Sequence, residues 1–145
     1  MLAGAAPVLV HNCNTSYQLS LDTRAAVGSG NAQDYQIAHT GATEYRAVGG
    51  GERVWADGLD RNTGELLDVK FIEKPGRSPS IPGSGIPDFI RSKITAKMDD
   101  EFSRYAAVIN DPFKALTGLR VITNHSGAVP YFQGLMQQHG IDLWL

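Results

Sequence analysis

The chain has 145 residues, of which 42% are hydrophobic and 19% are charged, and its net charge at pH 7 is −2. This length is enough for one domain with one core, and no apolar run reaches the roughly 20 residues that span a bilayer, so we expect no membrane-spanning segment. The negative charge argues against a protein that coats nucleic acid, but it allows an enzyme that touches nucleic acid through a local patch. Cys13 is the only cysteine, which excludes an intrachain disulfide and a zinc-knuckle spacing.

The first thirty residues are polar, contain glycine and are only weakly periodic, so we interpret residues 1–30 as a leader or linker. The pattern becomes regular from residue 31 onwards, and we predict one domain over residues 31–145. Residues 32–40 are expected to form a short helix.

Three strand-like runs follow this helix, at residues 44–48, 52–59 and 66–72. Glycines 49–51 separate the first two runs, and residues 61–64, Arg-Asn-Thr-Gly, separate the second from the third. Short polar connections that contain glycine are typical of hairpins. The sequence therefore predicts an antiparallel three-strand meander.

The second half alternates between helices and strands. Residues 75–87 hold four prolines, three glycines and three serines, which predicts a loop. Pro87 suits the start of a helix, whose buried stripe ends before Pro112 and consists of Ile90, Ile94, Met98, Phe102, Tyr105 and Ile109. We then expect a strand at residues 119–123, a helix from Pro130 to Gly140 and a final strand at residues 141–145, with the two strands parallel. The fold class is α/β: a meander followed by helix, strand, helix and strand.

Basic residues gather in one part of this otherwise acidic chain. Residues 70–97 contain six basic and two acidic side chains, a local net charge of +4. Such a cluster is most often a solvated surface, but it also suits contacts to a phosphate backbone. The candidates for nucleic-acid binding are Lys74, Arg77, Arg91, Lys93 and Lys97.

The meander carries the candidate catalytic residues. Asp68 and Lys70 lie two apart on one strand, so both side chains face the same side. If residues 61–64 form a four-residue loop, Asp57 lies directly opposite Asp68, whereas a three-residue loop would break this alignment. Two opposed carboxylates would raise one pKa or recruit a cation such as Mg²⁺ or Mn²⁺. Lys70 beside them could orient an attacking water or stabilise negative charge on a phosphate.

The run VWADGLDRNTGELLDVKF resembles the core motif of the PD-(D/E)xK nucleases. Asp57 matches the first acid, Asp68 the second acid and Lys70 the lysine, and the resemblance implies that the Val69 carbonyl adds a metal ligand. Ala56 stands where that family usually has proline, and the second acid is Asp where Glu is commoner. Many members use a further acid near the first helix, for which Glu44 is the candidate. The resemblance implies a restriction-endonuclease-like core that hydrolyses phosphodiesters with Mg²⁺ or Mn²⁺.

Residues 7–13, PVLVHNC, resemble the C-terminal splice junction of Hint or intein-like domains, and also the PVLVHN segment that precedes toxin domains of bacterial polymorphic toxins. The resemblance implies that Asn12 attacks its own carbonyl with help from His11, which would leave Cys13 first in the released piece. The rest of a Hint domain is missing from the sequence, so we do not expect autocleavage. An ordinary apolar linker is the alternative interpretation.

Taken together, residues 7–145 resemble the restriction-endonuclease-fold toxins of polymorphic toxin systems. The resemblance implies an endonuclease that is secreted by its producer, cuts DNA in the cytoplasm of a target cell and is neutralised by a cognate immunity protein. It also allows a homodimer, because this fold commonly pairs to cut both strands.

Other functions stay open at this point. The same fold could serve as a non-catalytic module that binds nucleic acid or protein, or as an RNase or a repair nuclease. Asn124-His125 suggests an HNH nuclease, but that chemistry needs further histidines with ligand spacing, which the sequence lacks. Cys13 is a poor candidate for a nucleophile because it lies in the expected leader.

Overall fold

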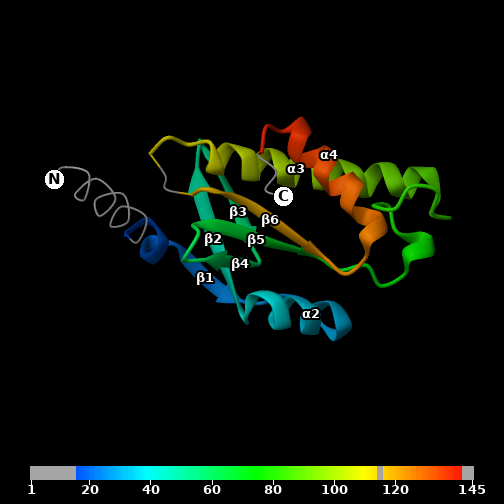
Figure 1. The fold of residues 1–145 in the computed structure, drawn as a ribbon, viewed down its shortest axis with the longest axis horizontal. Coiled ribbons are helices and arrows are strands. Elements are labelled where there is room, and N and C mark those ends of the chain that lie inside the picture. Colours follow the sequence, from blue (N-terminus) through cyan, green and yellow to red (C-terminus); the bar gives the residue numbers. More distant parts are fainter. Residues whose placement is uncertain (1–15, 114–115, 142–145) are drawn as a thin grey trace.

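The strands that follow residue 21 form two three-stranded sheets in the computed structural model, which describes residues 16–113 and 116–141 (Figure 1). One sheet is antiparallel with the order β1-β2-β3, and the other has the order β4-β5-β6. The strands are β1 (Asp22–Ala25), β2 (Thr43–Gly49), β3 (Glu52–Ala56), β4 (Gly58–Asp60), β5 (Glu65–Lys70) and β6 (Gly118–Thr123). The helices are α2 (Gly30–Thr40), α3 (Asp88–Ile109) and α4 (Val129–Gln138), with short 3₁₀ turns η2 (Pro75–Arg77) and η3 (Ser126–Ala128). The expected α/β class and the antiparallel meander are confirmed.

A two-glycine turn closes the hairpin between β2 and β3. Gly50 and Gly51 have φ angles of +58° and +78°, a backbone conformation that favours glycine. Gly50 also lies against α3, where an added Cβ would come 2.5 Å from the Ala107 carbonyl oxygen. Both the turn and the packing of α3 on this hairpin therefore require glycine at position 50.

The second strand of the meander is divided between the two sheets. Residues 52–56 pair with β2, whereas residues 58–60 pair with β5, and Asp57 is the single residue between them. The sequence predicted one continuous strand over residues 52–59. That prediction was wrong, because an apolar pattern reports which face of a strand is buried but not which sheet it pairs with.

The turn between β4 and β5 has the length on which the site argument depends. Asp60 pairs with Glu65 and Gly58 pairs with Leu67, so residues 61–64 form the four-residue loop. The Gly64 amide donates a 2.8 Å hydrogen bond to the Asp60 carbonyl and closes this turn. Continued by one residue, this register places Asp57, one residue before β4, opposite Asp68.

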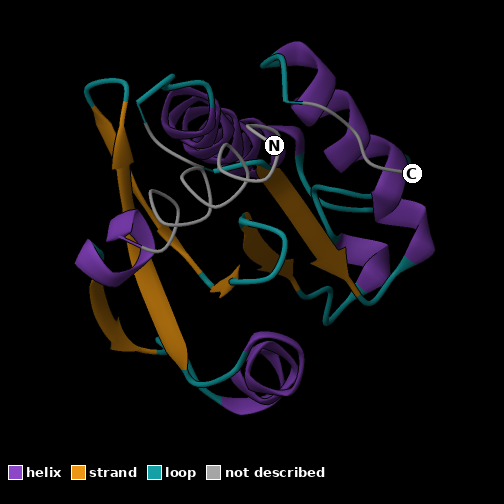
Figure 2. Cartoon of the chain, turned by 60° about the vertical axis from the view of Figure 1, so that its left-hand side comes forward, coloured by secondary structure: helices purple, strands orange, loops and turns teal. Residues whose placement is uncertain are grey.

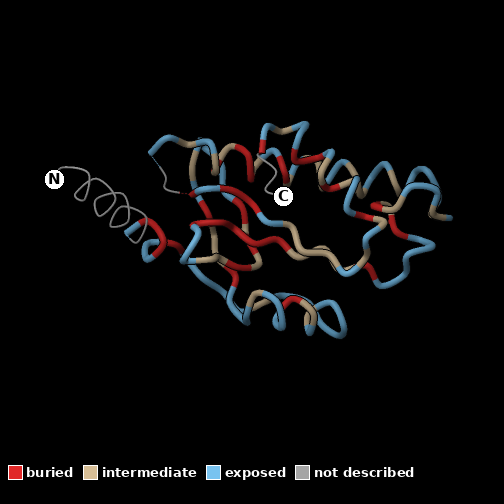
Figure 3. Tube along the Cα trace, in the orientation of Figure 1, coloured by how far each residue is buried: buried red, intermediate tan, exposed pale blue. Residues whose placement is uncertain are grey.

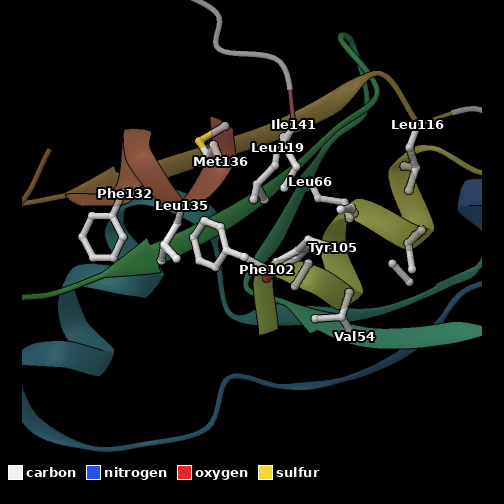
Figure 4. Close-up of a cluster of buried hydrophobic side chains, with 14 of the residues drawn as sticks. Val54, Leu66, Phe102, Tyr105, Leu116, Leu119, Phe132, Leu135, Met136 and Ile141 are labelled. Carbon is white, nitrogen blue, oxygen red and sulfur yellow. The ribbon is translucent and has the colours of Figure 1, made fainter. Parts of the chain in front are cut away.

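Helix α3 covers the strands on one side, and α2 lies on the other side beside β5 (Figures 1 and 2). Of the apolar stripe predicted for α3, Phe102 and Tyr105 are fully buried, together with Val108, which the prediction did not include. Ile90, Ile94, Met98 and Ile109 are only half-buried, and Ile94 and Met98 line a cavity. Phe102 stacks on Phe132 of α4 with ring centroids 6.4 Å apart. Buried positions therefore concentrate along the central strands and the inner faces of α3 and α4, whereas α2 is mostly exposed (Figures 3 and 4).

β6 runs parallel to β5, and α3 provides most of the connection between them. Pro87 sits at the N-cap of α3, and α4 follows β6 as the sequence predicts. The expected final strand falls largely outside the described residues, of which Ile141 is the last and is buried.

Residues 16–21 pack against the antiparallel sheet, and residues 22–25 form its edge strand β1. Residues 16–20 are helical, and Tyr17 and Leu21 are part of the buried core. The Tyr17 hydroxyl donates to the Val48 carbonyl over 3.0 Å and accepts from the Val48 amide over 3.2 Å. The division of the chain at residue 30 stays a prediction, and the PVLVHNC motif lies outside the described residues.

No helix among residues 16–113 and 116–141 combines the length and the apolar character needed to cross a membrane.

Candidate active site

The carboxyl group of Asp57, which lies between the two sheets, comes close to that of Asp68 in β5. Asp57 lies at the bend where the chain leaves β3, and its Oδ2 atom accepts a 2.6 Å hydrogen bond from the Val69 amide of β5. This bond holds the Asp57 side chain beside Asp68, and the two side chains interact directly. The opposed carboxylates predicted from the hairpin register are therefore adjacent in the fold.

Asp68 is 3% exposed, and its Oδ2 atom is buried without a hydrogen bond. The Nζ atom of Lys70 lies 3.1 Å from this oxygen and balances its charge as an ion pair. Burial raises the pKa of Asp68 to about 6, although the charge of Lys70 opposes the rise. Burial also raises the pKa of Asp57, against the opposing effect of the Val69 amide. The pair is therefore poised to gain either a proton or a cation.

Lys70 joins Asp68 to Glu101 of α3, since its Nζ atom is bonded to the Glu101 carboxylate as well. Burial disfavours the charged ammonium, but the two carboxylates outweigh it and raise the pKa of Lys70 well above its ordinary value. Lys70 is therefore a permanent cation at neutral pH, suited to stabilise negative charge rather than to accept a proton.

Glu101 is the residue of this cluster that the sequence analysis missed. It lies three residues after Met98 and four before Tyr105, so it shares the inward edge of α3 with that apolar stripe. Burial raises the pKa of Glu101, and the charge of Asp68 adds to the rise while Lys70 opposes it. An acid at the edge of a buried stripe was the signal available in the sequence.

Glu44, the candidate for a further acidic ligand, is buried in β2 and already has three donors. Its carboxylate accepts from Arg24 over 2.7 Å, from the Gln36 side chain over 2.8 Å and from the Val27 amide over 3.3 Å. Burial opposes ionisation, but these hydrogen bonds outweigh it and lower the pKa of Glu44. Its charge contributes to the raised pKa of Asp57. A role for Glu44 as a ligand stays a prediction.

The donor set around the two aspartates consists of oxygen atoms. Among the described residues, no group of three or more histidine, cysteine or acidic side chains is arranged to hold a metal, so a cation here would depend on two carboxylates and the backbone. The amide and the carbonyl of a strand residue in an antiparallel ladder face the same neighbour. Because the Val69 amide binds Asp57, its carbonyl faces that side too. The carboxylate oxygens of Asp57 and Asp68 and a backbone carbonyl are donors that fit Mg²⁺ or Mn²⁺.

The five basic candidates occupy different surroundings. Lys74 and Arg77 are exposed and, with Lys70, line a cavity of about 680 Å³. Arg91 instead binds the loop before α3, donating to the Pro79 carbonyl and to the carbonyl and hydroxyl oxygens of Ser84. Lys93 and Lys97 are exposed on α3 and form no ion pair with any described residue. Nucleic-acid binding stays a prediction for all five.

The residues behind the HNH alternative serve the local structure. Asn124 bridges to Ile72, accepting from its amide over 2.6 Å and donating to its carbonyl over 2.9 Å. His125 caps η3 through its Nδ1 atom, which accepts from the Gly127 amide. His139 contacts Asp99 at the surface of α3. Within the described part of the chain, the aspartate pair has no histidine partner.

An α/β fold whose meander presents Asp57 opposite an Asp-Val-Lys triplet defines the restriction-endonuclease class of domain. A family model described as restriction endonuclease fold toxin 2 matches residues 31–142, which is most of the chain. The chain therefore belongs to this family of toxins, and the resemblance drawn from the motif is confirmed. Neither a curated protein nor a solved structure matches the chain.

Proposed function

We propose that this domain is a toxin that hydrolyses phosphodiester bonds in DNA with a divalent cation, Mg²⁺ or Mn²⁺, held by Asp57, Asp68 and the Val69 carbonyl. The observation that carries the proposal is a pair of adjacent carboxylates, Asp68 buried and Asp57 half-buried, with the Lys70 Nζ atom 3.1 Å from Asp68 Oδ2. A site without such a function would be more stable with an amide at one of these positions, because adjacent buried carboxylates repel each other.

Each residue has a distinct part in this chemistry. The cation, when bound, would lower the pKa of a water molecule so that hydroxide is available for the attack. Its charge would also offset the negative charge of the phosphate. Asp57 and Asp68 hold it, and the Val69 amide fixes the orientation of Asp57. Lys70 presents its ammonium group at the same face and stabilises the charge that develops on the phosphate oxygens. Basic side chains after β5 hold the flanking phosphates.

The remaining proposals follow from the toxin family and from the earlier resemblance. We infer that the producer secretes the domain, that it acts in the cytoplasm of a target cell and that a cognate immunity protein neutralises it in the producer. A homodimer would bring two sites to the two strands of a duplex. DNA is the proposed substrate, and RNA is the outcome to be tested against it.

Plasmid cleavage tests the proposal most directly. Purified protein is incubated with supercoiled DNA in Mg²⁺, in Mn²⁺ and in EDTA, and a folded RNA is tested in parallel. We expect nicking that needs the cation and is lost in Asp57→Ala, Asp68→Ala and Lys70→Ala. Asp100→Asn is the matched control, because Asp100 is an exposed acid on α3 whose one ion pair with a described residue is to Arg104.

Two results would overturn the proposal. Cleavage at the wild-type rate by all three site variants would show that the assigned residues do not take part in catalysis. Binding of nucleic acid without cleavage in any metal would leave a binding module on this fold, and cleavage of RNA alone would correct the substrate.

A further inference from the structure

A cavity of about 680 Å³ opens directly on the candidate catalytic strand. Val69 and Lys70 line it at the end of β5, and the chain that follows, through Lys74, forms one wall. Side chains of α2 and α3 form the opposite walls. Its volume falls in the range of roughly 300–1,000 Å³ that is typical of small-molecule sites.

The lining combines apolar side chains with positive charge. Phe71, Ile94, Met98 and Phe132 supply apolar surface, and Phe71 is packed against Tyr35 with ring centroids 5.3 Å apart. Lys74 and Arg77 are exposed residues of the cavity lining, whereas Lys70 is half-buried there and paired with Asp68 and Glu101. Among the described residues that line the cavity, Glu73 is the only acid. Flat apolar surface beside cations suits a planar base with its phosphate, since bases stack on apolar and aromatic side chains while phosphates need a positive partner.

The part of the lining formed by residues 77–80 is held in place by Arg91. The guanidinium of Arg91 bonds to the Pro79 carbonyl and to Ser84, and the Ser84 hydroxyl in turn donates to the Ser78 carbonyl over 2.5 Å. Ser78 and Ser80 are consequently buried although the segment is rich in proline and glycine. A fixed wall favours a cavity that exists before the ligand arrives.

We infer that this cavity takes one unpaired nucleotide of the nucleic acid being cut, with the base on the apolar lining and the backbone phosphates at Lys74 and Arg77. This inference rests on the proposed nuclease function and specifies its substrate class: DNA or RNA that has an unpaired nucleotide, or a duplex that can release one. A base that is stacked and paired cannot enter a pocket, so a duplex would first have to release it.

The inference is tested by filling the cavity from α2. Ala32 is an exposed residue of α2 that lines the cavity, so Ala32→Trp places a ring in the proposed base site. Ala38→Trp is the matched control, since Ala38 is exposed on the same helix and does not line the cavity. Binding of fluorescein-labelled oligonucleotides is measured by anisotropy in EDTA, so that cleavage does not intervene. The probes are a 12-nucleotide strand, a paired hairpin duplex and the same duplex with one bulged nucleotide, each as DNA and as RNA.

We expect the single strand and the bulged duplex to bind at least tenfold more tightly than the paired duplex. Ala32→Trp should abolish this preference without lowering the melting temperature, and Ala38→Trp should keep it. Lys74→Gln combined with Arg77→Gln should weaken binding of every probe and flatten its salt dependence.

Equal affinity of the wild-type protein for paired and unpaired probes would overturn the inference, as would a preference that survives Ala32→Trp. Cleavage of plasmid DNA in Mg²⁺ is measured on the same preparation. If the plasmid is cut but the protein shows no preference for unpaired probes, the nuclease proposal stands and the inference of a nucleotide-binding cavity is wrong. If no nucleic acid is bound or cut, both fall.

Discussion

Lys70 of β5 and Glu101 of α3 form a largely buried ion pair that joins the candidate catalytic strand to the longest helix of the fold. The same ammonium group lies 3.1 Å from Asp68, so two carboxylates hold it from two elements. A lysine side chain has four rotatable bonds, and these two contacts together restrict its position.

Glu101 is expected to act as a positioning residue for Lys70. Glu101→Gln removes one of the two charges that hold the ammonium, and we expect the cleavage rate to fall roughly 10- to 100-fold, as for other residues that orient a catalytic group. The loss should appear in kcat with little change in KM, and Glu101→Asp should restore part of the rate. Measurement of both constants with an oligonucleotide substrate checks this, with Asp100→Asn as the control on the same helix. An unchanged kcat in Glu101→Gln would show that Asp68 alone positions the lysine.

The raised pKa of Asp68 predicts how pH governs cation binding. The folded value is about 6 and the ordinary value is about 3.9, so the folded state holds a proton more tightly than the unfolded chain. This contribution to stability is complete below about pH 4 and is lost as the pH rises through about 6. A cation needs the ionised form. We therefore expect Mg²⁺ to raise the melting temperature at pH 7.5 but not at pH 5, and cleavage to decline below about pH 6.

Asp68→Asn provides the comparison for this pH dependence. An amide carries no negative charge at any pH, so the variant should bind Mg²⁺ poorly and its melting temperature should not respond to Mg²⁺ at either pH. A Mg²⁺ response of equal size at pH 5 and pH 7.5 in the wild-type protein would mean that the cation is held elsewhere.

We expect Arg91 to stabilise the Pro/Gly/Ser loop, in addition to any contact that it makes to nucleic acid. Arg91→Ala removes three hydrogen bonds that a charged group donates. Hydrogen bonds of this kind contribute up to about 3 kcal/mol each, so we expect a clear loss of unfolding free energy. Cleavage of residues 78–85 by an added protease should become faster. Urea unfolding and limited proteolysis measure both effects. Lys93→Ala, at an exposed position of the same helix, should change neither, and equal behaviour of the two variants would contradict the assignment.

The hairpin glycines allow a direct test of the packing of α3. Gly50→Ala combines strain from a positive φ with a Cβ 2.5 Å from the Ala107 carbonyl, whereas Gly51→Ala carries the strain alone because no atom lies within 4 Å. Backbone strain of this kind costs of order 1–3 kcal/mol. We expect Gly50→Ala to lose clearly more unfolding free energy than Gly51→Ala in a urea titration. Equal losses would mean that α3 can move away from the hairpin freely.

Much of the site follows from short-range rules. The alternation along residues 66–70 puts Asp68 and Lys70 on one face, and the four-residue turn at 61–64 aligns Asp57 with Asp68. Both depend on spacing within 14 residues of sequence. Glu101 lies 31 residues beyond Lys70, and only the packing of α3 brings the two together.

Other features depended on pairings that no local pattern encodes. β1 lies in a polar segment whose four strand residues are all exposed, so it lacks the alternation by which strands are recognised. The surroundings of Glu44 are assembled from β1, α2 and β2, and its saturation by Arg24 and Gln36 could not be foreseen from its position alone. The break at Asp57 likewise follows from sheet docking, a property of the whole fold.

The break at Asp57 also makes the site sensitive to how the two sheets are docked. Asp57 directly follows the last strand of one sheet, and Asp68 lies within a strand of the other. A shift of one sheet relative to the other would therefore change the distance between the two carboxylates. A cation bound by both carboxylates would link the two sheets and oppose such a shift. Conversely, a protein that binds elsewhere and increases the separation of the two sheets would inactivate the domain without covering the site.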